Sequence, residues 1–172
     1  MDARVWLSLG SNIDREHNMR TAVSALEQRF SPLIVSQVYE SEAVGFDGEP
    51  FYNMVVGLDT DLPVDQLKQY LHELEMNQGR DRTGRRFAPR TLDIDLLTYG
   101  DTVLDSAYAR LPRDEILRYA FVLRPLSEVA GDERHPLDGR SYRELWAAFD
   151  QPDQPLWPVA LEFPVGIGRG ER

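Results

Sequence analysis

The residues best suited to chemistry in this chain are arginines and aspartates that lie close together near its middle. Five arginines fall between Arg80 and Arg90, in a sequence whose formal net charge is -10. Guanidinium groups bind phosphate oxygens through paired hydrogen bonds, which favours triphosphate contacts from Arg80, Arg82 and Arg90. For Arg85 and Arg86, a solvated charge run paired with acidic surface groups is an equally good interpretation.

The arginines run directly into Asp93 and Asp95. Side chains alternate along a strand, so both carboxylates would face one way while Leu92, Ile94 and Leu96 face the core. A solvated strand face is the alternative. Aspartate is depleted in strands, however, and two close carboxylates repel unless a cation joins them. The pair therefore predicts a site for a hard cation such as Mg²⁺, beside a loop that binds phosphates.

Two further groups of residues are candidates for binding. Glu75 lies near the end of an expected helix, where the helix dipole disfavours negative charge. It either pairs with Arg80 or shapes a nucleotide site. Phe51, Asn53 and Phe121 could hold a flat heterocycle between two rings while the amide reads its edge. Spacing alone favours ordinary core positions for the aromatic residues.

Composition limits the class of protein. The chain has 172 residues, 42% of them apolar and 28% charged, which fits one globular domain with a proper core. A pI near 4.7 argues against a general nucleic-acid binder. The absence of cysteine excludes disulfides, thiol catalysis and cysteine-bound zinc. Because no apolar run approaches membrane-spanning length and no signal peptide is evident, we expect a cytoplasmic protein.

The elements that must position these residues follow from periodicity and turn signals. Strands are expected at residues 5–9, 33–39, 51–58, 92–98, around 103–104 after a hairpin turn, and at 119–123. Helices are expected at residues 18–29, 61–77, 126–130 and 141–149. The order strand, helix, strand, strand, helix, strand predicts an α+β fold with a ferredoxin-like core and additions. Residues 1–150 form the predicted domain, and residues 151–172, rich in proline and glycine, form an extended tail.

Six short motifs, taken together, resemble the 6-hydroxymethyl-7,8-dihydropterin pyrophosphokinase family of folate biosynthesis. They lie at residues 7–12, 39–45, 51–53, 75–82, 88–95 and 121–126, in the family's order and spacing. The run from Arg90 to Asp95 is highly specific, whereas the motif at residues 10–12 is weak evidence alone. The resemblance implies an α-β-α sandwich with a mainly antiparallel sheet around the ferredoxin-like core. It also implies transfer of a pyrophosphoryl group from ATP to the pterin hydroxymethyl group, with release of AMP.

The resemblance also assigns roles to individual residues. Asp93 and Asp95 would hold two Mg²⁺ ions along the triphosphate, and catalysis would depend on them and on Arg80, Arg82 and Arg90. The nucleotide site would be lined by Glu75, Arg82, Phe87, Arg90, Leu96, Arg113 and Arg118. The pterin would contact Ser41, Ala43, Val44, Phe51, Asn53 and Phe121. We expect a monomer that binds neither nucleic acid nor membranes.

The chain departs from the family's pattern at three positions. Phe87, Arg113 and Tyr119 stand where the family usually has tryptophan, histidine and a phosphate-binding arginine. Arg118 could supply the charge that Tyr119 lacks, and Arg113 could replace the histidine as a donor. Two alternatives therefore stay open. One is a divergent relative that binds a pterin but transfers slowly or acts on a related pterin; the other is a non-enzymatic ferredoxin-like module that binds metabolites or partners.

Overall fold

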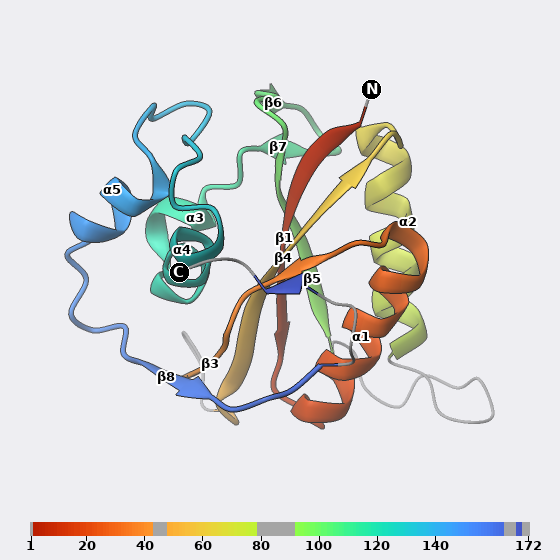
Figure 1. Cartoon of the computed structure of the whole chain (residues 1–172), viewed down its shortest axis with the longest axis horizontal. Helices are drawn as coiled ribbons and strands as arrows, with labels where there is room; N and C mark the ends of the chain where they lie inside the picture. Colours follow the sequence, from red (N-terminus) through yellow and green to blue (C-terminus); the bar gives the residue numbers. More distant parts are fainter. Residues whose placement is uncertain (1, 43–47, 79–91, 164–167, 170–172) are drawn as a thin grey trace.

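The architecture is a central sheet with helices on both sides, seen in a computed structural model that describes residues 2–42, 48–78, 92–163 and 168–169 (Figure 1). The described strands of this sheet are β1 (Ala3–Ser11), β2 (Ile34–Val35), β3 (Val38–Ser41), β4 (Phe51–Thr60), β5 (Asp93–Tyr99), β8 (Leu156–Val159) and β9 (Gly168–Arg169). The helices are α1 (Arg15–Phe30), α2 (Val64–Gln78), α3 (Glu115–Arg118), α4 (Ala120–Val129) and α5 (Tyr142–Ala147). This is the α+β class that the sequence predicted.

The sheet is mainly antiparallel, and its longest strands lie at the centre. The described strands follow the order β5-β1-β4-β2-β9, while β3 pairs with β4 and β8. Strand β1 runs antiparallel to both β4 and β5, whereas β2 and β9 are parallel. No described strand pairs with the outer edge of β5. Side chains from α2 and from the chain around β7 lie near this edge.

Each face of the sheet has its own hydrophobic core. Helices α1 and α2 cover one face, and α3, α4 and α5 lie on the other (Figure 1). Strand β1 contributes to both cores because its side chains alternate: Leu7 and Leu9 pack with Leu26 of α1, and Trp6 packs with Leu126 of α4. The sheet is therefore held on both sides, which fixes the direction of every side chain on its strands.

Most expected elements are present, with two differences in strand pairing. The strands and helices expected at 5–9, 18–29, 51–58, 61–77 and 92–98 are β1, α1, β4, α2 and β5. The single strand expected at 33–39 is instead two, β2 and β3, because the Ser36 hydroxyl accepts the Val55 N–H at 2.9 Å in place of a backbone carbonyl. The short strand expected after Gly100 is β6 (Leu104–Asp105), which pairs with β7 (Arg110–Leu111) and not with β5.

The strand expected at residues 119–123 is wrong, because these residues begin helix α4. Val122, Leu123 and Leu126 are buried at helical spacing against the sheet. A short apolar run does not distinguish a strand from a buried helix, and α4 continues through Pro125. Phe121 is consequently presented by the first turn of a helix.

The C-terminal segment adds strands to the sheet. Strand β8 pairs antiparallel with β3, β9 pairs parallel with β2, and Leu161 is buried in the core beneath α1. The pairing of this segment with the sheet was not expected from the sequence. The domain boundary at residue 150 stays a prediction.

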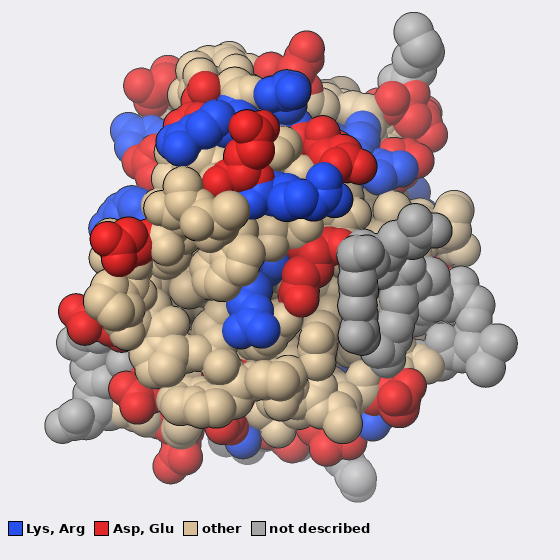
Figure 2. Space-filling view, turned by 60° about the vertical axis from the view of Figure 1, so that its left-hand side comes forward, with Lys and Arg blue, Asp and Glu red and all other residues tan. Residues whose placement is uncertain are grey.

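The described surface mixes charges of both signs. Figure 2 shows acidic and basic side chains interleaved on one face, with no continuous basic stripe among the described residues there. Of the described helices, none combines the length and the apolar character that crossing a bilayer requires.

Candidate active site between two pockets

Asp93 and Asp95 lie on one face of strand β5, as the alternation predicted. Ile94 and Leu96 are buried in the core on the opposite side. Both aspartates are half-buried, and both line each of two pockets that meet at this strand. A group held by these carboxylates would therefore be within reach of ligands in either pocket.

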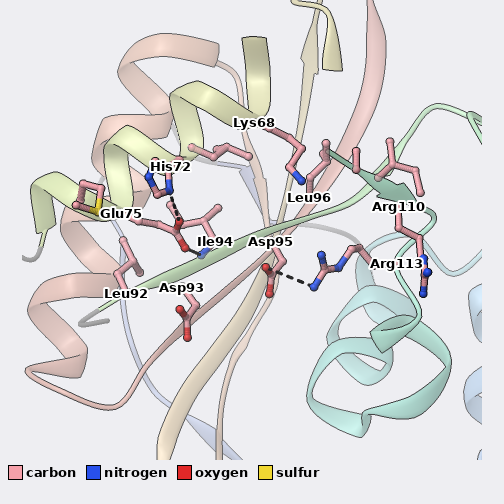
Figure 3. Close-up of a pocket in the computed structure, with 14 residues that line it drawn as sticks. Lys68, His72, Glu75, Leu92, Asp93, Ile94, Asp95, Leu96, Arg110 and Arg113 are labelled. Carbon is pink, nitrogen blue, oxygen red and sulfur yellow. Dashed lines mark hydrogen bonds and ion pairs between the residues drawn. The ribbon is translucent and has the colours of Figure 1, made fainter. Parts of the chain in front are cut away.

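The first pocket, of about 470 Å³, lies between α2 and the chain around β7 (Figure 3). Its basic lining residues are Lys68, His72, Arg110 and Arg113. Figure 3 shows Arg113 directed toward Asp95 from the side of the pocket opposite Glu75. Basic side chains together with two carboxylates suit an anionic ligand that brings a cation with it.

Among the described basic residues, Arg113 forms an ion pair with one of the aspartates. Its Nη2 lies 3.8 Å from Asp95 Oδ1, and its Nε donates a 3.0 Å hydrogen bond to Glu115 Oε2. Burial alone would lower the pKa of Arg113, but the carboxylates of Glu115 and Asp95 outweigh it and hold the pKa above its usual value. Arg113 therefore contributes a permanent positive charge to the pocket, where the sequence expected a nucleotide contact.

Glu75 ties strand β5 to helix α2. Its Oε2 accepts a hydrogen bond from the Ile94 N–H at 2.7 Å, and its Oε1 lies 3.8 Å from His72 Nδ1. Burial raises the pKa of Glu75, and the charges of Asp93 and Asp95 raise it further, while the Ile94 hydrogen bond acts to lower it. Glu75 thus lines the first pocket and also anchors the backbone between the two aspartates.

We expect Glu75→Ala to lower the free energy of unfolding by about 1–3 kcal/mol, because the Ile94 N–H loses its acceptor. Glu75→Gln keeps an oxygen for that N–H and removes the repulsion from Asp93 and Asp95, so its stability at pH 7 should equal or exceed wild type. Urea unfolding without ligands measures both, with Glu73→Ala on the exposed face of α2 as the control. Equal losses in the two Glu75 variants would contradict this role for the hydrogen bond.

The second pocket, of about 460 Å³, lies on the α4 face of the sheet. It brings together four residues expected to bind a flat heterocycle: Ser41, Phe51, Asn53 and Phe121. Sheet register places one of them beside an aspartate, since Asn53 pairs with Gly10 and Gly10 pairs with Asp93. Directly paired residues share a face, so these three form a row across β4, β1 and β5.

The amide of Asn53 is fixed within this row. Asn53 is buried, and its Nδ2 donates a 2.7 Å hydrogen bond to Ser41 Oγ. A Cβ on Gly10 would lie 3.1 Å from Asn53 Oδ1, so the glycine keeps space beside the amide oxygen. A held amide and a hydroxyl provide an acceptor and a donor at fixed positions, which is what reading the edge of a heterocycle requires.

Phe121 reaches the second pocket from α4, where Tyr119 packs against it. The two ring centroids are 5.0 Å apart and the planes differ by 15°. Arg118 is exposed, with its guanidinium carbon 5.3 Å from the centroid of the Tyr119 ring. Arg118 is not among the described residues that line the two pockets, so its nucleotide contact stays a prediction.

Several predicted site residues lie outside the described part of the chain: Ala43, Val44, Arg80, Arg82, Phe87 and Arg90. Their roles stay predictions, as does the alternative pairing of Glu75 with Arg80. Leu96 is described, and it is both buried in the core and part of the lining of the first pocket.

The lining of the second pocket also includes residues that were not predicted, among them Ser8, Gly10 and Glu115. Gly10 had a usable signal, because a glycine at the end of an apolar strand often marks a close approach of other groups. Ser8 pairs with Asp95 across β1 and β5, a register that the sequence does not reveal. Glu115 had no signal either, since its place depends on the ion pair with Arg113.

Comparison with known sequences shows one family along most of the chain. Residues 6–131 match the family model described as 7,8-dihydro-6-hydroxymethylpterin-pyrophosphokinase (HPPK). A protein of Pseudomonas aeruginosa named 2-amino-4-hydroxy-6-hydroxymethyldihydropteridine pyrophosphokinase is 39% identical over 152 residues, covering 86% of this chain and 93% of its own length. An Aquifex aeolicus protein of the same name is 31% identical over 165 residues, covering 95% and 99%.

Solved structures share the fold at low sequence identity. A Plasmodium falciparum HPPK-DHPS chain crystallised with pteroate aligns with a TM-score of 0.62 at 15% identity, over 86% of this chain and 42% of that one. An HPPK-DHPS chain in complex with substrates aligns with a TM-score of 0.62 at 11% identity, over 87% of this chain and 44% of that one. The chain thus spans less than half of these larger proteins, and the likeness supports its α+β architecture.

Proposed function

This chain belongs to the 7,8-dihydro-6-hydroxymethylpterin-pyrophosphokinase family, and we propose which of its residues bind each substrate and which hold the metal. The enzyme transfers a pyrophosphoryl group from ATP to 6-hydroxymethyl-7,8-dihydropterin in folate biosynthesis. The two alternatives left open by the sequence are not favoured, because its relatives are named as pyrophosphokinases.

The observation that carries the proposal is that Asp93 and Asp95 line both pockets. We assign ATP to the first pocket, whose basic side chains suit a polyphosphate. We assign the pterin to the second pocket, whose aromatic rings and amide suit a flat heterocycle. With the two substrates on either side of β5, the pterin hydroxyl and the β-phosphorus would meet beside the carboxylates. Such positioning is the main requirement for phosphoryl transfer.

Mg²⁺ fits the donor chemistry of the two aspartates. This ion is usually held by one or two carboxylates together with substrate phosphates. Among the described residues, no group of three or more acidic or histidine side chains could bind a metal ion by itself. Asp93 and Asp95 would therefore hold the two expected ions jointly with the triphosphate. The ions would neutralise the charge that opposes attack on the β-phosphorus.

Arg113 is proposed to bind phosphate oxygens from the far side of the first pocket. Its hydrogen bond to Glu115 holds the guanidinium group near Asp95, where the negative charge of a bound triphosphate would lie. A guanidinium group offers more donors than Glu115 alone can use, so a second contact is available. Arg80, Arg82 and Arg90 are proposed to add phosphate contacts, as the resemblance implies.

The pterin is proposed to lie between the rings of Phe51 and Phe121. Asn53 and Ser41 would then read its edge through the hydrogen-bonded pair that joins β3 to β4. Stacking would orient the heterocycle with its hydroxymethyl group toward β5, and the aromatic rings would limit the access of competing water to the reacting atoms.

The core topology, the oligomeric state and the absence of nucleic-acid binding are also proposed. The strand order β5-β1-β4-β2, with helices after β1 and β4, supports a ferredoxin-like core within residues 1–150. A monomer is proposed because residues of one chain line both pockets. The interleaved charges in Figure 2 support a protein that does not bind nucleic acid.

Calorimetry tests the division into two sites and the need for the metal. We expect a non-hydrolysable ATP analogue to bind about tenfold or more tightly with Mg²⁺ than with a chelator, because the aspartates then meet a cation instead of bare phosphate. The pterin should bind without competing with the analogue. Competition between the two ligands, or equal nucleotide affinity with and without Mg²⁺, would contradict the assignment.

Arg118 provides a test of the departure at Tyr119. We expect Arg118→Ala to lower kcat by about tenfold and to change substrate affinity less, as for a charge that acts mainly in the transition state. Tyr119→Arg should leave activity unchanged or raise it. Steady-state kinetics measure both, with Arg143→Ala on the exposed face of α5 as the control. Wild-type kinetics in Arg118→Ala would show that this arginine is only a surface charge.

A further inference from the structure

A side chain from the C-terminal segment brackets the junction between helices α3 and α4. The Nε2 of Gln154 donates a 3.0 Å hydrogen bond to the Arg118 carbonyl, and its Oε1 accepts the Ala120 N–H at 2.8 Å. These two backbone groups flank Tyr119 on either side. Gln154 lies beyond residues 6–131, the part of the chain that matches the family model.

Both bonds satisfy backbone groups that the helices leave without partners of their own. The first N–H groups and the last carbonyl groups of a helix have no acceptor or donor within it. Tyr119 separates α3 from α4 with an extended backbone, φ -122° and ψ 126°, and its side chain caps neither helix. The side-chain amide of Gln154 therefore caps the end of α3 and the start of α4, which restricts the backbone on both sides of Tyr119.

This junction carries one aromatic wall of the second pocket. Tyr119 and Phe121 both line that pocket, and their rings are stacked at 5.0 Å. Because Tyr119 backs the Phe121 ring, a shift of the junction would tilt both rings. The position of the ring assigned to pterin stacking thus depends on a contact made from outside the pocket.

The same segment also supports the opposite wall. After α5 the chain passes the α3–α4 side of the sheet and enters β8 beside β3 (Figure 1). There Leu156 pairs with Ser41, whose hydroxyl accepts the hydrogen bond from the Asn53 amide. A small pocket of about 210 Å³ lies between these contacts, lined by residues 153–156 together with Ser41, Glu42, Tyr119 and Phe121. The segment therefore reaches both walls of the pterin pocket.

We propose that Gln154 is a positioning residue for the pterin site, which fixes the α3–α4 junction so that Tyr119 holds Phe121 in its stacking position. Gln154 acts through Tyr119 and does not itself contact the pterin. The inference rests on the proposed function, since the pterin is the ligand assigned to this pocket. It extends the determinants of pterin affinity to a segment beyond residues 6–131, the span of the family model.

The test compares Gln154→Ala and Gln154→Glu with Gln151→Ala, a glutamine in the same segment whose side chain is exposed. We expect Gln154→Ala to weaken pterin binding about fivefold to tenfold, the scale of one or two lost hydrogen bonds, and to change the KM for ATP less than about twofold. Gln154→Glu keeps the acceptor for Ala120 but sets a carboxylate against the Arg118 carbonyl, so it should lose at least as much. Gln151→Ala should match wild type.

A double variant separates positioning from general stability. If Gln154 acts through Phe121, adding Gln154→Ala to Phe121→Ala should cost little further pterin affinity, because the ring it positions is already gone. Wild-type protein that neither binds the pterin nor releases AMP would defeat the proposed function itself. Active wild-type protein with unchanged pterin affinity in Gln154→Ala, additive losses in the double variant, or equal losses for pterin and ATP would each overturn this inference.

Discussion

Replacing Asp95 by alanine is expected to lower kcat by about 10³-fold or more while leaving the fold intact. Loss of a metal-binding carboxylate removes several kcal/mol of charge stabilisation from the transition state, and each 1.36 kcal/mol is about tenfold in rate. Asp93→Ala should have an effect of the same order, because both carboxylates border both pockets. Single-turnover measurements at saturating Mg²⁺, ATP and pterin would report the chemical step directly.

The fold should tolerate these changes because both side chains are half-buried and lie on the pocket face of β5, whereas Ile94 and Leu96 keep the strand on the core. Circular dichroism and the urea midpoint check this. Asp101→Ala, in the exposed turn after β5, is the matched control and should keep wild-type turnover. Near-normal turnover in both Asp93→Ala and Asp95→Ala would show that these carboxylates do not hold the metal.

Removing the Phe121 ring is expected to weaken pterin binding by about 1–3 kcal/mol, the scale of stacking a base on an aromatic side chain. The affinity for an ATP analogue should change much less, because Phe121 lines the second pocket and is not among the described residues of the first. Calorimetry of Phe121→Ala with each ligand separately measures the difference between the two sites.

A stacked aromatic residue elsewhere provides the control for Phe121. Phe149 is also half-buried and packs on Trp146 with ring centroids 5.5 Å apart, and neither residue lines the second pocket. Phe149→Ala should therefore cost stability without a selective loss of pterin affinity. Unchanged pterin affinity in Phe121→Ala, or an equal loss in the two variants, would mean that the Phe121 ring serves only the core.

The aspartate site could be predicted from sequence because it depends on one strand. Alternation alone places Asp93 and Asp95 together on one face of β5 and Ile94 in the core, whatever the neighbouring strands are. The helices α1 and α2 could be predicted equally well, since their apolar residues recur at helical spacing. A feature that depends only on the periodicity of one strand or helix can be predicted from a single sequence.

Features that depend on contacts between distant segments were missed or misassigned. The apolar run at residues 119–123 fits a strand or a buried helix equally well, and only the core beneath it selects the helix. Gly10 acquires its place from the register of three strands. Gln154 contacts the α3–α4 junction through a hydrogen bond to Ala120, 34 residues away in sequence, and no local pattern predicts such a contact.

Phosphorus NMR of both products tests whether a pyrophosphoryl group passes from ATP to the pterin at the junction of the two pockets. Protein, Mg²⁺ and ATP are incubated with and without 6-hydroxymethyl-7,8-dihydropterin. Transfer at the junction of the two pockets predicts AMP and a pterin pyrophosphate in equal amounts, with little AMP when the pterin is absent. Release of ADP with a pterin monophosphate, or AMP formation that does not depend on the pterin, would show that the two pockets do not carry out this transfer.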